Sequence, residues 1–190
     1  MEQYPPAVHH TIVVTDIENF TDPDRTNLDQ LAIRRGLYEI IERAFAATRV
    51  DWTACKIEDR GDGVFVLIPA DVPKALLATN MLSQLARLLR SYNAHRLTRT
   101  GIRLRVAMHA GKVHYDPHGV TGCAINHAFR LIETRAFKSA LRASTGSLGA
   151  IVSAWFYEEV IRHYPVAEPG SYRRVRVRAV NGGGWIRLFG

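Results

Sequence analysis

The alternation of apolar and polar positions predicts a chain in which strands and helices follow one another. The β-branched run at residues 11–15 indicates a buried strand, and residues 28–47 carry apolar side chains at helical spacing. Two further strands are expected at residues 52–58 and 64–68. The segment 59–63 between them places glycines around an acidic residue, which is typical of a tight hairpin turn.

The second half of the chain continues in the same manner. Residues 102–109 alternate as a strand, and Gly111 is expected to turn the chain into a second hairpin strand at 112–115. The other expected elements are a helix at 72–92 with Pro73 in its first turn, a third helix at 120–141, a strand at 150–153 that leads into a fourth helix, and a last hairpin of strands 173–180 and 185–189.

This order of elements predicts an α+β fold with a ferredoxin-like βαββαβ core, extended by a C-terminal helix and a β-hairpin. We expect the helices to cover one face of the sheet. No repeat, linker or low-complexity segment divides the chain. Residues 1–190 are therefore expected to form a single domain, with residues 1–8 flexible.

The composition is ordinary for a globular protein, with 47% apolar and 23% charged residues. No apolar run approaches the ~18 residues of a membrane span, and the first six residues lack the layout of a signal peptide. We therefore expect a cytoplasmic protein with no membrane partner. The two cysteines, Cys55 and Cys123, lie far apart and are interpreted as reduced thiols.

The formal net charge of +7 indicates an anionic partner. Nucleic acid is one candidate, but the chain contains no recognised nucleic-acid-binding motif. A nucleoside triphosphate would also be bound by clustered arginines. Net charge alone does not choose between these partners, and the motifs favour the nucleotide.

A first candidate site lies where the strand at 11–15 ends. Asp16 offers a hard oxygen ligand for a phosphate-bound metal ion, and the backbone amides that follow it, at Asn19, Phe20 and Thr21, can face phosphate. The ordinary alternative is a strand-end aspartate that caps the next turn. For this segment alone the two interpretations are equally good.

Asp62, between two glycines of the expected hairpin, is a second candidate, although for this segment alone a plain Asp-Gly turn is the better explanation. If the first strand lies beside this hairpin, Asp16 and Asp62 meet across neighbouring strands. Two carboxylates at such closeness repel each other unless cations lie between them. Phosphoryl transfer by two metal ions requires this arrangement.

Asn126 and Arg130 form a third candidate, because residues four apart share one face of a helix. An amide beside a guanidinium can hold a ribose and a phosphate that develops charge. A solvated polar helix face is the alternative.

Four segments together resemble the catalytic domain of class III adenylate and guanylate cyclases. The matching segments are VVTDIENFT at residues 13–21, EDRGDGVF at 58–65, RLRVAMHAGKV at 103–113 and GCAINHAFRL at 122–131. Their order and spacing agree with the family over nearly the whole chain. The resemblance implies an enzyme, a lyase that converts a nucleoside triphosphate into a 3′,5′-cyclic monophosphate and pyrophosphate.

The resemblance also implies roles for individual residues. Asp16, Asp62 and the Ile17 carbonyl would hold two Mg²⁺ or Mn²⁺ ions. Asn126 would orient the ribose, and Arg130 would stabilise the transition state. In this family the site forms between the protomers of a head-to-tail dimer, so the resemblance implies a homodimer with two shared sites.

A basic residue in a late strand grips the triphosphate in this family. Arg174, Arg176 and Arg178 share one face of the predicted strand, because strand side chains alternate, and Arg178 is the best match. The register is open by two residues. An arginine-rich edge strand that deters aggregation is the alternative.

Two positions bear on the choice of base. Glu58 stands where guanylate cyclases have Glu and adenylate cyclases have Lys, and Gly119 stands where a second base-selecting side chain is usual. An ionised Glu58 accepts hydrogen bonds only, which suits a base that offers N–H, namely guanine, uracil or cytosine, and not adenine N1. Lys56 lies on the same strand face as Glu58, so a slip of two residues would change this assignment.

The small size and the missing purine selectors also resemble the bacterial pyrimidine cyclases of anti-phage defence, which make cyclic UMP or cyclic CMP as second messengers. Three alternatives stay open: a guanylate or adenylate cyclase, a degenerate cyclase fold that regulates a partner, and a nucleic-acid-binding module. The degenerate fold is suggested by the loss of the usual glycine in the first loop, where Glu18 and Asn19 precede Phe20.

Overall fold

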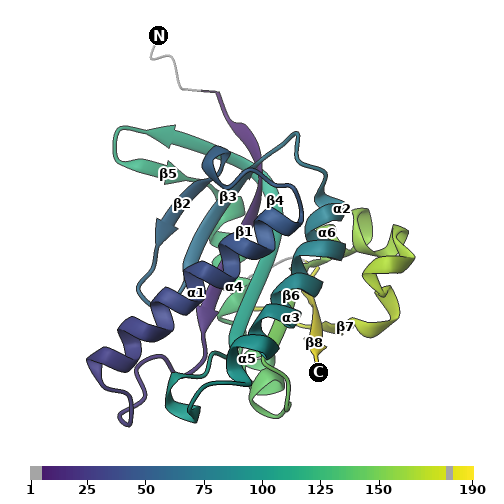
Figure 1. Ribbon diagram of the computed structural model, residues 1–190. Coiled ribbons are helices and arrows are strands. Elements are labelled where there is room, and N and C mark those ends of the chain that lie inside the picture. The colour runs from purple at the N-terminus through teal and green to yellow at the C-terminus, as the bar shows by residue number, and fades with distance from the viewer. Residues whose placement is uncertain (1–5, 179–181) are drawn as a thin grey trace.

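A computed structural model describes residues 6–178 and 182–190, which form one mixed sheet with helices packed on it (Figure 1). The strand order is β2-β3-β1-β4-β6-β8-β7, and β5 pairs with β4 outside this path. The elements are β1 Val8–Ile17, α1 Asn27–Ala47, β2 Lys56–Asp59, β3 Val64–Pro69, α2 Lys74–Leu76, α3 Leu82–Asn93, β4 Leu104–Asp116, β5 Gly119–Thr121, α4 Cys123–Ile132, α5 Arg135–Arg142, β6 Leu148–Ser153, α6 Ala154–Glu159, β7 Arg173–Val175 and β8 Gly184–Phe189.

The first half of the chain forms the predicted ferredoxin-like core. Strand β1 pairs antiparallel with both β3 and β4, and β2 pairs antiparallel with β3. Helix α1 begins where the sequence predicts because Thr26 caps it. The Thr26 side chain accepts from the Asp29 amide, and the Asp29 carboxylate accepts from the Thr26 amide.

The second half widens this sheet. Strand β6 pairs parallel with β4, and β8 and then β7 follow in antiparallel order. The extra helix and hairpin that the sequence predicts are α6 and the β7–β8 pair. The α+β fold with a βαββαβ core is therefore confirmed.

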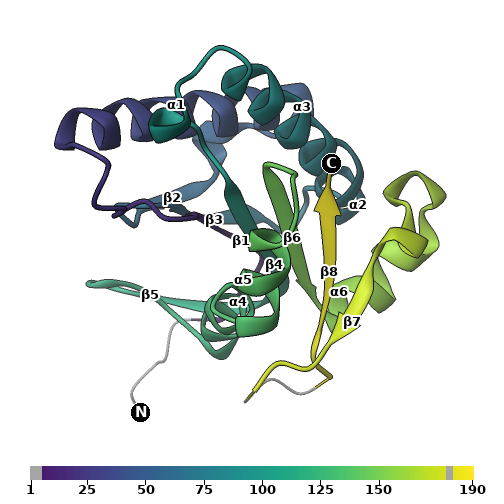
Figure 2. The ribbon, with the colours of Figure 1, turned by 90° about the horizontal axis from the view of Figure 1, so that it is seen from below.

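Helices cover both faces of the sheet, so the expectation of one covered face is wrong. Helices α1 and α3 lie on one side, and α4 and α5 lie on the other (Figure 2). Val13 and Ile17 of β1 pack in the core beneath α1 and α3, whereas Ile12 and Val14 pack in the core beneath α4 and α5. The continuous apolar run of β1 follows from burial on both sides.

Gly111 does not turn the chain. Strand β4 runs unbroken through it to Asp116, and the hairpin turn lies at residues 117–118 before β5. A Cβ added at Gly111 would come within 2.6 Å of the Ala124 Cβ of α4. The glycine therefore permits close approach of a helix to the strand rather than a change of direction.

Three other boundaries differ from the predictions. The expected helix 120–141 is two helices, α4 and α5, because the chain leaves helical geometry at residues 133–134 and Val120 belongs to β5. Residues 52–54 form a 3₁₀ turn in which the Thr53 amide donates to the Asp51 carboxylate, so β2 begins only at Lys56. The helix expected at 72–92 begins at Lys74, after Pro73, and contains a π-helical turn at residues 77–81 before α3.

The two ends of the chain also differ from expectation. Residues 1–5 and 179–181 lie outside the described residues, so the predictions for them stay predictions. Val8, which was expected to be flexible, begins β1. Strand β7 ends at Val175, five residues earlier than predicted. No helix in the described part of the chain is both long enough and apolar enough to cross a membrane.

Candidate active site

Asp16 and Asp62 lie side by side, as the strand order predicts. The Ile17 amide donates to the Asp62 carbonyl oxygen at 2.9 Å, which joins the end of β1 to the β2–β3 turn. A Cβ at Gly63 would come within 1.9 Å of the Thr15 carbonyl oxygen. Only glycine allows the hairpin to approach β1 this closely, and that approach sets the two carboxylates together.

The surroundings of Asp16 oppose its ionisation unless a positive charge lies beside it. Burial raises the pKa of Asp16 to about 6, the Arg105 guanidinium opposes this shift, and the Asp62 carboxylate adds to it. The Asp16 side chain is 15% exposed and forms an ion pair with Arg105, its cross-strand neighbour on β4. Its Oδ2 atom accepts no hydrogen bond of regular geometry.

The donor set fits a metal ion that is shared with phosphate. Mg²⁺ is usually held by one or two carboxylates together with substrate phosphate oxygens. Asp16, Asp62 and the Ile17 carbonyl match that pattern. No group of three or more His, Cys, Asp or Glu side chains that would enclose a metal occurs in residues 6–178 and 182–190.

The turn that carries Asp62 is fastened to α1, which sequence reasoning missed. The Asp59 carboxylate accepts hydrogen bonds from Arg34, from Tyr38 Oη at 2.8 Å and from the Gly61 amide at 2.6 Å. Hydrogen bonds from Arg34 and the Gly61 amide hold the pKa of Asp59 well below its usual range. The only available signal was an acidic residue two positions before a glycine, which is a common turn pattern.

The loop after Asp16 is fastened as well. Glu18, whose side chain is 5% exposed, accepts a hydrogen bond from Arg103 Nε at 2.6 Å. Arg103 also donates to the backbone carbonyls of Leu141 and Ser144 near the end of α5. Sequence reasoning did not assign Arg103, because its partners come from two distant segments.

Asn19 replaces the usual glycine without breaking the turn. Its φ of 56° lies in the left-handed region, which asparagine tolerates better than most residues. Its carbonyl oxygen accepts from Arg25 at 2.8 Å. The Phe20 ring packs against the core on the α1 side, and Thr21 is exposed.

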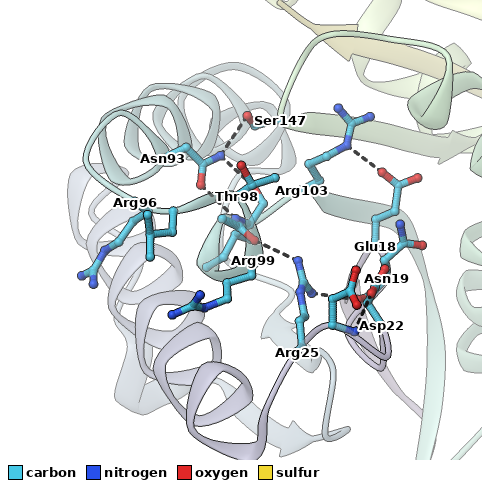
Figure 3. Close-up of a pocket in the computed structure, with 14 residues that line it drawn as sticks. Glu18, Asn19, Asp22, Arg25, Asn93, Arg96, Thr98, Arg99, Arg103 and Ser147 are labelled. Carbon is cyan, nitrogen blue, oxygen red and sulfur yellow. Dashed lines mark hydrogen bonds and ion pairs between the residues drawn. The ribbon is translucent and has the colours of Figure 1, made fainter.

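A cavity of about 550 Å³ lies behind this loop (Figure 3). The Glu18–Arg103 pair forms one wall, and Asn93, bonded to Ser147 Oγ at 3.0 Å, stands opposite. The cavity is lined by residues of the β1–α1 loop, the end of α3, the segment before β4 and the loop before β6.

The residues on α4 have a different setting. Asn126 and Arg130 are exposed and line a shallow hollow of about 450 Å³ with Phe129 and Glu133. A second hollow of about 350 Å³ lies beside it and is lined by Arg130, Arg135, Arg176 and Arg178, among others. The structure thus places Arg178 and Arg130 around the same hollow.

Arg176 reaches the same hollow, so it and Arg178 lie on the same side of the chain, as predicted. Both residues follow the end of β7 at Val175, so the predicted strand does not extend to them. They flank Val177, whose side chain is buried in the core beneath α4. Burial of Val177 leaves both arginines exposed on the rim of the hollow.

Glu58 on β2 lies between two cations. The Lys56 Nζ atom is 3.9 Å from Glu58 Oε1, and an Arg60 terminal nitrogen is 3.4 Å from Glu58 Oε2. Gly119 lies in the β4–β5 hairpin, where an added Cβ would meet nothing within 4 Å. Space for a side chain therefore exists, but the φ of 144° at Gly119 disfavours any residue other than glycine.

No protein-family model and no curated protein matches the sequence. Solved structures match the fold. The adenylate/guanylate cyclase/hydrolase from Silicibacter pomeroyi has a TM-score of 0.65 and 13% identity, covering 97% of this chain and 99% of that chain. The guanylyl cyclase Cya2 has a TM-score of 0.63 and 15% identity, covering 98% and 96%. The guanylate cyclase domain of RhGC from Catenaria anguillulae, solved with GTP, has a TM-score of 0.59 and 17% identity, covering 96% and 98%.

The chain has the fold of a class III nucleotidyl cyclase domain. In this cyclase fold the candidate residues divide into two groups. The carboxylates lie at adjoining strand ends, and Asn126, Arg130 and Arg178 are displayed around α4.

Proposed function

We propose that this protein is a nucleotidyl cyclase that converts a nucleoside triphosphate into a 3′,5′-cyclic monophosphate and pyrophosphate. The observation that carries the proposal is the contact between the end of β1 and the β2–β3 turn, which places Asp16 beside Asp62. The cyclase fold supports the same activity.

Each group has a chemical role in the proposed reaction. Asp16, Asp62 and the Ile17 carbonyl hold two Mg²⁺ or Mn²⁺ ions, which supply acidity to the 3′-hydroxyl and charge neutralisation to the leaving pyrophosphate. Asn126 orients the ribose for in-line attack. Arg130 stabilises the charge that develops on the α-phosphate, and Arg178 binds the triphosphate.

The proposal includes a homodimer with shared sites. Asn126, Arg130 and Arg178 are exposed on one protomer, and a solvent-exposed guanidinium gives little electrostatic stabilisation. An opposing protomer that presents Asp16 and Asp62 would remove water from these side chains. Each dimer would then contain two sites, each built from both chains.

We further propose a pyrimidine triphosphate as the substrate, UTP ahead of CTP, with the product acting as a cytoplasmic second messenger in antiviral defence. Glu58 accepts from a base N–H, and Gly119 offers adenine no acceptor for its amino group. A guanylate cyclase is the second candidate, since Glu58 also suits guanine N1–H.

Incubation of the purified protein with each of the four ribonucleoside triphosphates and Mn²⁺, followed by mass analysis, tests the activity. We expect a cyclic monophosphate and an equal amount of pyrophosphate. Nucleotide binding without turnover of any of the four would contradict the cyclase proposal and favour a regulatory module, in which Arg105 neutralises Asp16 in place of a metal ion.

A further inference from the structure

Three charged side chains follow one another along one edge of the β2–β3 hairpin. Lys56 and Glu58 share a strand face, because side chains two apart in a strand point to the same side. Arg60 continues this row past the strand end. Glu58 therefore has a cation beside each carboxylate oxygen, Lys56 at Oε1 and Arg60 at Oε2.

Arg60 is held in place by aromatic rings rather than by its charge partner alone. Its guanidinium carbon lies 5.4 Å from the centroid of the Phe65 ring and 5.0 Å from that of Phe129. Phe65 is the cross-strand partner of Glu58, and Phe129 belongs to α4. The side chain of Arg60 remains 43% exposed, so it has nitrogen donors to offer.

Phe129 connects this row to the proposed ribose site. It lines the same hollow as Asn126 and Arg130. A nucleotide whose ribose is held at Asn126 would therefore have its base near the row formed by Lys56, Glu58 and Arg60. All of these residues belong to one protomer.

The hydrogen-bonding groups along this row follow the order donor, acceptor, donor, from Lys56 through Glu58 to Arg60. Lysine and arginine only donate hydrogen bonds, and an ionised glutamate only accepts them. Uracil presents the complementary order along its pairing edge, with a carbonyl on each side of N3–H. Guanine presents acceptor, donor, donor, so its amino group would face a cation. Cytosine presents an amino donor followed by two acceptors, N3 and O2, and adenine presents an amino donor beside the N1 acceptor. Both bases would therefore place a ring nitrogen acceptor against the Glu58 carboxylate, which is itself an acceptor.

We propose that Lys56, Glu58 and Arg60 together select uracil, with Glu58 accepting from N3–H and the two cations donating to O2 and O4. This inference rests on the proposed cyclase function and names its substrate. It assigns specificity to two residues, Lys56 and Arg60, that the resemblance to cyclases does not.

Substitution by methionine tests each donor, because methionine keeps the length of the side chain and its packing on the aromatic rings. Arg60→Met and Lys56→Met should each lower kcat/KM for UTP about tenfold or more, as expected for loss of a hydrogen bond from a charged donor. Turnover of CTP should change much less. Glu58→Gln can donate to a ring nitrogen and should move the preference from UTP toward CTP.

Arg162→Met is the matched control, since Arg162 forms an exposed ion pair with Glu158 on another face of the domain. It should leave the UTP/CTP ratio unchanged. Binding of 3′-deoxy-UTP and 3′-deoxy-CTP, which lack the attacking hydroxyl, gives the same comparison without turnover. If Arg60→Met fails to fold, Arg60→Lys keeps one donor and should retain part of the preference for UTP.

Equal losses for all four nucleotides would show that Arg60 only braces the hairpin against α4, and they would overturn the inference. A wild-type enzyme that turns over GTP or CTP faster than UTP would overturn it and leave the cyclase proposal standing. A wild-type protein that forms no cyclic product with any nucleotide would contradict the cyclase proposal itself.

Discussion

The two halves of the candidate site are built in opposite ways. The carboxylate half is partly buried and cross-linked: Asp16 pairs with Arg105, Glu18 pairs with Arg103, and Asp59 fastens the turn that carries Asp62. The α4 half is exposed, and its polar side chains stand on a ten-residue helix and on the segment after β7. One half is organised by its own protomer, whereas the other presents groups that an opposing surface would complete.

The largest expected effect is on the carboxylate half. Asp16→Ala and Asp62→Ala should each lower turnover by about 1000-fold or more, since each removes a ligand of the proposed metal ions. The two variants should differ in stability. Asp62→Ala relieves repulsion and should leave the thermal unfolding midpoint unchanged. Asp16→Ala removes the ion-pair partner of Arg105, whose side chain is only 10% exposed, and should lower the thermal unfolding midpoint. Full activity in either variant would contradict the two-metal assignment.

Mixing variants from the two halves tests whether they meet between protomers. Inactive Asp16→Ala and inactive Arg130→Ala proteins should regain activity when their subunits exchange, because each mixed dimer has one site with all of its parts. With free exchange about half of the dimers are mixed, so activity should approach about a quarter of wild type. Subunit exchange can be followed by mass spectrometry of labelled subunits. Mixtures that exchange subunits and still stay inactive would place the whole site within one chain.

A smaller effect should follow from loosening the first loop. Glu18→Gln removes the charge that holds Arg103, so the Ile17 carbonyl loses its fixed position. We expect the Mn²⁺ concentration for half-maximal binding, measured by electron paramagnetic resonance, to rise about tenfold, with a loss of about 1–3 kcal/mol in the free energy of unfolding. Glu158→Gln, in the exposed Glu158–Arg162 pair, should change neither quantity. Reduced stability with unchanged Mn²⁺ binding would make Glu18 a residue of structural importance only.

The smallest expected effects lie at the two arginines that follow β7. Arg176→Ala and Arg178→Ala should each raise KM for the nucleotide a few-fold and leave kcat nearly unchanged, because several arginines line the same hollow and those that remain still bind the triphosphate. The double variant should lose more than either single variant. An effect confined to Arg178 would show that Arg176, despite lining the same hollow, does not contact the triphosphate.

Several features of the fold were readable from local pattern. The β-branched run of β1, the helical spacing of α1 and the order of elements predicted the core because each depends on neighbouring residues. The local pattern failed at Gly111 and at residues 133–134. A glycine required for contact with Ala124 looks the same in sequence as a glycine required for a turn, and two short helices with matching apolar spacing look like one.

For the candidate site, the sequence by itself determined which side chains could do chemistry: the residue types and spacing of Asp16, Asp62, Asn126 and Arg130. Only the tertiary structure decided what surrounds them. Asp59 contacts α1, Arg103 reaches the end of α5, and Arg60 lies over a ring of α4, each across a wide separation in the chain. Such contacts depend on how strands and helices pack, and packing is set by the whole buried surface rather than by any local run of residues.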